Sequence, residues 1–126
     1  MRIRREQLVK MIRTHLTRAA DAHKHFTVST TSRNFNDLAM ECFQTVNYTI
    51  ALMERIFESR KGGSAMTYTE LVDTLEKLAV LKRADAEKLR RLIRLRNLIA
   101  HEYFTISTDE LRKMYELLPS VRALFR

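Results

Sequence analysis

Glycine and proline are nearly absent from this chain, which has two Gly and one Pro in 126 residues. Apolar residues instead recur at intervals of three and four, the spacing that gathers them on one face of an α-helix. A sheet would need more turn residues. Hydrophobic residues make up 45% of the chain, enough for a core without disulfide or metal support. We therefore predict an all-α fold, an antiparallel bundle of about five helices that forms one domain over residues 1–126.

The first half of the chain predicts two helices separated by a loop. One helix is expected over about residues 2–26, and residues 27–32 are expected to form a loop because five of these six side chains carry hydroxyls. A central helix is expected over about residues 36–59. The sequence Gly62-Gly63-Ser64 follows it, and it lacks the lysine and the Ser or Thr of a phosphate-binding loop. We interpret it as a turn.

The second half predicts three more helices. A long one is expected over about residues 84–104, and Pro119 is expected to break or kink the last one. Two capping-box sequences mark where the shorter helices begin, namely Thr67 with Glu70 and Ser107 with Glu110.

Charge and cysteine content narrow the class of protein. The formal net charge is +8, with 23 Lys and Arg against 15 Asp and Glu, which favours a polyanionic partner such as RNA, DNA or an acidic protein. The single cysteine, Cys42, lies in an apolar helical pattern and offers neither a disulfide framework nor a thiolate metal cluster. The basic amino terminus is not an apolar signal region, and no run is long enough to span a bilayer. We expect a cytoplasmic protein with no membrane segment and no cofactor.

The candidate site lies in the octet that runs from Arg96 to Tyr103. On a helical wheel at about 100° per residue, Arg96 falls in the middle of the apolar face, together with Tyr103. A buried charge without a partner would cost several kcal/mol. We therefore expect a carboxylate partner, with Glu41 first and Asp37 second, or else the phosphate of a ligand.

His101 falls about 140° from Arg96 on the same wheel, in a polar row with Arg90, Arg94 and Asn97. Such a row suits a phosphate backbone, although a solvated basic face has the same pattern. On one straight helix Arg96 and His101 diverge. Either the helix loosens near His101, or a second copy supplies the complementary residue across a two-fold dimer interface.

The spacing of Arg96, His101 and Tyr103 resembles the Arg-x4-His-x-Tyr motif of HepT-like toxins in the HEPN superfamily. The likeness extends over about residues 38–104 in the order of helices and loops. It implies a homodimeric helical bundle whose two motifs form one basic cleft that cuts RNA without a metal. It also implies a toxin-antitoxin pair, in which an MntA-type nucleotidyltransferase neutralises the toxin by AMPylation of Tyr103.

The resemblance implies a role for each motif residue. His101 would be the general base that takes a proton from a ribose 2′-hydroxyl, and Arg96 would stabilise the charge of the transition state. Arg90, Arg94 and Asn97 would bind RNA phosphates. Two other functions compete with an endoribonuclease. One is a non-catalytic, nucleotide-binding partner subunit of a nucleotidyltransferase, and the other is a nonspecific RNA- or DNA-binding bundle.

Overall fold

The computed structural model describes residues 3–61 and 67–126, and every regular element within them is helical. The described elements are five α-helices and two short 3₁₀ helices: α1 (Arg5–Val28), α2 (Ser32–Lys61), α3 (Tyr68–Lys77), α4 (Arg83–Glu102), η1 (Tyr103–Thr105), α5 (Thr108–Leu117) and η2 (Leu118–Leu124). The predicted all-α class is therefore confirmed. The predicted turn at Gly62-Gly63-Ser64 lies outside the described residues.

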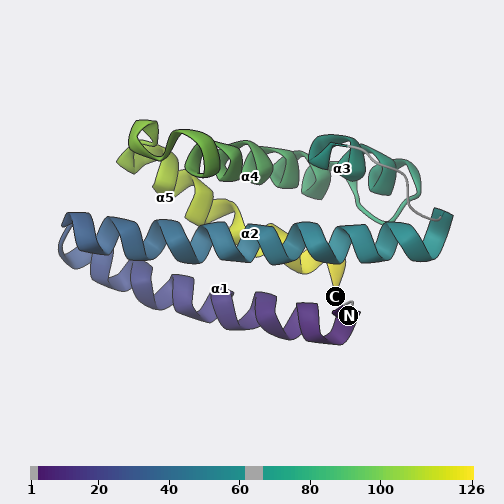
Figure 1. Cartoon of the computed structure of the whole chain (residues 1–126), viewed down its shortest axis with the longest axis horizontal. Coiled ribbons are helices and arrows are strands. Elements are labelled where there is room, and N and C mark those ends of the chain that lie inside the picture. Colours follow the sequence, from purple (N-terminus) through teal and green to yellow (C-terminus); the bar gives the residue numbers. More distant parts are fainter. Residues whose placement is uncertain (1–2, 62–66) are drawn as a thin grey trace.

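The long helix α2 is the axis of the bundle (Figure 1). Helix α1 runs antiparallel along one side of it, while α3 and α4 lie on the other side and α5 crosses behind it. The carboxyl-terminal segment returns to α1, where the Arg13 guanidinium lies 5.2 Å from the centre of the Phe125 ring. The apolar faces of all these helices meet in one core, which includes Phe26, Leu38 and Leu92.

The connection between α1 and α2 is shorter than predicted. Only residues 29–31 separate the two helices, because hydroxyl and amide side chains satisfy the backbone at the turn. Thr31 Oγ1 accepts a hydrogen bond from the backbone N–H of Asn34 at 3.2 Å. The Asn34 amide donates in turn to the carbonyl oxygen of Ser29 at 2.7 Å. The predicted loop over residues 27–32 is wrong at both ends for this reason.

The cap predictions for the later helices agree with the structure. Thr67 accepts a hydrogen bond from the Glu70 backbone N–H, and Ser107 and Glu110 form a reciprocal capping box. Pro119 lies in the first turn of η2, directly after α5 ends at Leu117. Its missing N–H explains why the α-helix does not continue.

Helix α4 ends at Glu102, earlier than the predicted end at about residue 104, so Tyr103 lies outside it. Glu102 has φ −142° and ψ 50°, outside the helical region, and a 3₁₀ turn follows it. The wheel therefore applies only as far as Glu102. Tyr103 follows as the first residue of η1, and its hydroxyl, like the guanidinium of Arg96, hydrogen-bonds to α2.

Candidate active site

Arg96 is half-buried on α4, where neutral side chains hold its guanidinium. Its Nε donates a hydrogen bond to Asn47 Oδ1 of α2 at 2.8 Å, and its Nη1 donates to Asn97 Oδ1 at 2.9 Å. The central carbon of the guanidinium lies 5.2 Å from the centre of the Phe43 ring and 5.4 Å from that of the Tyr68 ring. Two aromatic rings and two amides therefore orient the cation without cancelling its charge.

The predicted pairing of Arg96 with Glu41 is wrong. Glu41 Oε1 lies 2.6 Å from His15 Nδ1 of α1, and the His15 ring stacks on Tyr48 at 5.4 Å. The Glu41 carboxylate therefore belongs to the interface of α1 and α2, on another side of the central helix. No ion pair among residues 3–61 and 67–126 involves Arg96. Asn47, a residue the sequence did not single out, takes the place predicted for a carboxylate.

Arg96 and His101 line one hollow of about 530 Å³ between α3 and α4. We call it the Arg96 hollow, and its lining residues are Thr67, Tyr68, Thr69, Ile93, Arg96, Asn97 and His101. His101 is exposed, so its imidazole is open to a ligand from solvent. Arg96 and His101 diverge on the wheel, but both side chains border this hollow. The divergence therefore does not place them at separate sites.

Tyr103 does not line that hollow, although both it and Arg96 hydrogen-bond to α2. It lines a second hollow of about 420 Å³ beside the start of α2, together with Thr30, Thr31, Ser32, Phe35, Asn36 and Ile106. Its hydroxyl donates a hydrogen bond to Asn36 Oδ1, and its ring meets the Phe35 ring edge to face at 6.3 Å. Burial raises the pKa of the Tyr103 phenol, so the hydroxyl stays protonated at neutral pH.

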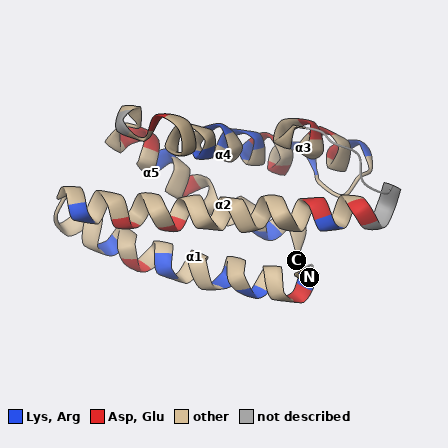
Figure 2. Ribbon diagram, in the orientation of Figure 1, with Lys and Arg blue, Asp and Glu red and all other residues tan. Residues whose placement is uncertain are grey.

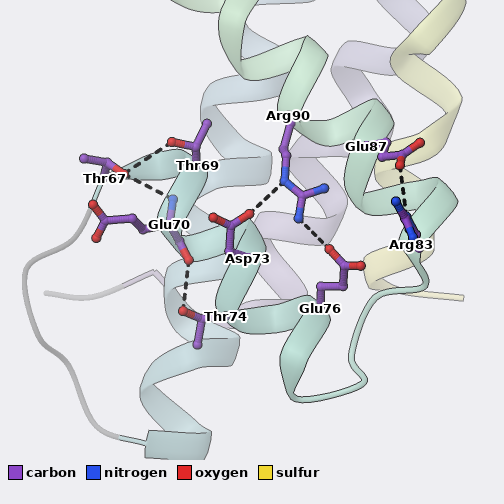
Figure 3. A network of polar contacts seen from close by, with 9 residues as sticks. All are labelled: Thr67, Thr69, Glu70, Asp73, Thr74, Glu76, Arg83, Glu87 and Arg90. Atoms are coloured by element: carbon purple, nitrogen blue, oxygen red, sulfur yellow. Dashed lines mark hydrogen bonds and ion pairs between the residues drawn. The ribbon is translucent and has the colours of Figure 1, made fainter.

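Arg90 is paired with carboxylates of α3 (Figure 3). Its Nε donates to Asp73 Oδ1 at 2.8 Å and its Nη2 donates to Glu76 Oε1 at 2.5 Å. Both contacts raise the pKa of Arg90, Glu76 more than Asp73. Arg90 thus fastens α3 to α4, which leaves Arg94 as the exposed arginine of the predicted basic row.

Charge is distributed unevenly over this side of the molecule. Figure 2 shows Lys and Arg recurring along α4, while Asp and Glu are prominent on α3 beside it. The acidic residues of α3 that pair with Arg90 therefore neutralise that arginine. Arg94 and Arg96, further along α4, have no ion pair among the described residues.

Three residues of this site were missed or misjudged from the sequence. Phe43 was counted only as a core residue, and Asn47 and Tyr68 were not singled out. Phe43 and Asn47 lie four residues apart on α2, so the same helical face presents both to α4. Tyr68 directly follows the predicted cap at Thr67, and that position was the only signal available for it.

Metal ligands do not gather anywhere in the described part of the chain. No group of three or more His, Cys, Asp or Glu side chains lies close enough together to hold an ion there. Cys42 is buried, and burial, with the charge of Glu41 second, raises the pKa of its thiol. A protonated, buried thiol is unreactive.

Comparison with known proteins identifies the family. Residues 6–124 match the family model described as ribonuclease HepT-like, and the chain therefore belongs to the HepT-like ribonuclease family. The family expected from the Arg-x4-His-x-Tyr spacing is thus confirmed. No curated protein and no solved structure matches the chain.

Among the described residues, no helix has the length and apolar character that crossing a bilayer requires.

Proposed function

We propose that this protein is an endoribonuclease toxin that cuts RNA in the Arg96 hollow without a metal ion. The observation that supports this most is the pairing, in one hollow, of an exposed imidazole at His101 with a guanidinium that no described carboxylate neutralises. Such a guanidinium presents a fixed positive charge to a phosphate. Membership of a ribonuclease family is the second support.

The proposed reaction is transfer of the phosphate to the neighbouring ribose oxygen. His101 takes the proton of the 2′-hydroxyl, the 2′-oxygen bonds to phosphorus, and the bond from phosphorus to the 5′-oxygen breaks. The departing oxygen takes a proton from water or from the protonated histidine of a second copy. General base catalysis of this kind contributes about 10² to 10⁴ in rate, and a preorganised cation such as Arg96 stabilises the extra negative charge on phosphorus.

The basic residues around the hollow would guide the RNA. We propose that Arg94 and Asn97 contact its backbone, since Asn97 lines the hollow and Arg94 is exposed on the same helix. Arg90 has two of its donor nitrogens bound to carboxylates. The share of phosphate binding first assigned to Arg90 is therefore expected to be the smallest of the three.

The proposed toxin acts as a homodimer and has a nucleotidyltransferase antitoxin as its partner. In AMPylation the Tyr103 oxygen would attack the α-phosphate of ATP, forming an O–P bond and releasing pyrophosphate. Burial raises the pKa of the Tyr103 phenol, so the transfer requires a base that removes its proton. Co-expression should add AMP to the mass of the protein, and Tyr103→Phe should prevent the gain. An unmodified Tyr103 beside an active antitoxin would contradict this step.

RNA cleavage by chelator-treated protein tests the proposed activity. We expect fragments that end in a 2′,3′-cyclic phosphate and no cleavage of DNA, which lacks the 2′-hydroxyl. His101→Ala should abolish cleavage while leaving the circular dichroism spectrum unchanged. His25→Ala is the matched control, since His25 is exposed on α1 and lies 3.7 Å from Asp21. Loss of cleavage on adding chelator would contradict the proposed mechanism, and tight nucleotide binding with no cleavage would favour a partner subunit.

A further inference from the structure

Tyr68 stands at the rim of the Arg96 hollow with a ring that the fold does not fully cover. It is the first residue of α3, and 38% of its surface is exposed. The Arg96 guanidinium carbon lies 5.4 Å from the centre of the Tyr68 ring and 5.2 Å from that of the Phe43 ring. The guanidinium therefore contacts both rings, of which Phe43 packs against the core and Tyr68 is exposed.

Several contacts fix the helix that carries this ring (Figure 3). Thr67 Oγ1 caps its first turn by accepting from the Glu70 backbone N–H at 3.1 Å, and it lies 3.3 Å from Thr69 Oγ1. One turn and two turns further on, the carboxylates of Asp73 and Glu76 bind Arg90 of α4. Contacts with Arg96 and Arg90 thus hold α3 against α4 near both of its ends. The Tyr68 ring is therefore in place before a ligand binds.

We propose that Tyr68 is a stacking platform for an unpaired nucleobase next to the phosphate that Arg96 binds, so that single-stranded RNA is the substrate. This inference rests on the proposed function, because it concerns the same hollow. A base stacked on the exposed Tyr68 ring would lie next to the guanidinium that binds its phosphate. Every base has a π-face, so such a platform binds without regard to sequence.

The rim of the hollow offers the Tyr68 ring as its exposed aromatic surface. Thr67 Oγ1 is already engaged at the cap. No hydrogen bond within residues 3–61 and 67–126 uses the Tyr68 hydroxyl, so Tyr68→Phe separates the ring from the hydroxyl. A base inside a duplex has both faces covered by its neighbours, so a stem would have to open before it could bind.

A binding cycle between the protein and the RNA tests the platform. The probe is a single-stranded RNA with 2′-deoxyribose at the cleavage position, which prevents cleavage, and a second probe lacks the base at the neighbouring nucleotide. We expect Tyr68→Leu to weaken binding of the intact probe about tenfold, which corresponds to about 1.4 kcal/mol. Binding of the abasic probe should change less than about twofold for the same substitution. Tyr68→Phe should bind both probes as the wild type does.

Other results would overturn the platform. If Tyr68→Leu weakens both probes equally, Tyr68 acts through Arg96 or through the fold and not through the base. Loss of affinity in Tyr68→Phe would assign the effect to the hydroxyl. Tyr115→Leu is the control, because the Tyr115 ring stacks on His23 at 4.0 Å on another face of the bundle.

Fluorescence of 2-aminopurine at the same nucleotide gives a measurement that does not depend on how well Tyr68→Leu folds. Wild-type protein should quench it by stacking, and unchanged emission on saturation would overturn the proposal. Binding and cleavage also separate the two hypotheses. If Tyr68→Leu weakens the intact probe more than the abasic one but the wild type cuts no RNA, the nuclease hypothesis is wrong and the platform stands. If the wild type cuts RNA but the two probes are affected equally, only the platform is wrong.

Discussion

Two arginines of α4, six residues apart, have opposite surroundings. Arg90 meets two carboxylates of α3, while Arg96 meets two amides and two aromatic rings. Carboxylates satisfy a guanidinium and also neutralise it, whereas amides satisfy it and leave the charge in place. One arginine therefore fastens two helices together, and the other remains available to an anion.

Arg96→Lys tests whether the planar group matters beyond its charge. Lysine keeps the positive charge, but its compact ammonium lacks the planar face that packs on two rings and the rigid fork of donors that fits two amides. We expect kcat/KM for RNA to fall about tenfold to hundredfold, the equivalent of about 1.5 to 3 kcal/mol for hydrogen bonds to a charged group. The melting temperature should change little. Full activity in this variant would mean that a point charge is enough.

Arg90→Ala tests whether Arg90 stabilises the contact between α3 and α4. It leaves Asp73 and Glu76 without their cation, and we expect the free energy of unfolding in urea to fall by about 1 to 2 kcal/mol. Cleavage by the folded fraction should change only a few-fold. Arg83→Ala is the control, since the Arg83 and Glu87 side chains are 84% and 59% exposed and such a pair contributes less than about 1 kcal/mol. Equal losses of unfolding free energy in the two variants would show that Arg90 does not join α3 to α4 more strongly than an exposed ion pair would.

Asn47→Asp makes the surroundings of Arg96 resemble those of Arg90. The new carboxylate can still accept from Arg96 Nε, but it also neutralises the guanidinium. We expect cleavage to fall about tenfold, or roughly 1.4 kcal/mol, although the fold stays as stable as before. Asn47→Ala removes the acceptor alone and should cost about 1 kcal/mol or less. A fully active Asn47→Asp variant would contradict the view that neutral partners preserve the function of Arg96.

Tyr103 gives the smallest expected effect, seen only in alkaline solution. Because burial raises the pKa of its phenol in the folded state, its contribution to stability is complete below the unfolded pKa of about 10 and is lost as pH rises through the folded pKa. As pH rises above about 10, urea unfolding should therefore show a steeper loss of stability in the wild type than in Tyr103→Phe. Parallel slopes would place the phenol in a solvated environment.

Much of the fold was predictable because local rules decide it. The spacing of apolar residues locates the helices, and the caps at Thr67 and Ser107 and the break at Pro119 follow from side-chain chemistry within three residues. The turn between α1 and α2 is shorter than these local rules predicted. Its Thr and Ser residues argue against a helix, yet Thr31 and Asn34 bind the backbone and close the turn in three residues.

The site was predictable in its motif and not in its surroundings. The positions of Arg96, His101 and Tyr103 indicated the family, and the wheel placed Arg96 and Tyr103 on one face. Both side chains hydrogen-bond to α2, but they line separate hollows, which a wheel cannot show. The partner of Arg96 also depends on how α2 is turned against α4, which places Asn47 and not Glu41 at the guanidinium. Such a rotation depends on packing between helices far apart in the sequence.

A side-by-side measurement of Arg96→Gln and Arg90→Gln tests the central claim most directly. Both variants remove one charge from the same helix and keep an amide of similar length. The single-turnover rate of RNA cleavage is measured at saturating protein and corrected for the folded fraction. We predict a loss of about 10² to 10³ for Arg96→Gln, as for other preorganised charge-stabilising groups, and a loss of only a few-fold for Arg90→Gln. Equal losses, or a larger loss for Arg90→Gln, would contradict the assignment of catalysis to the Arg96 hollow.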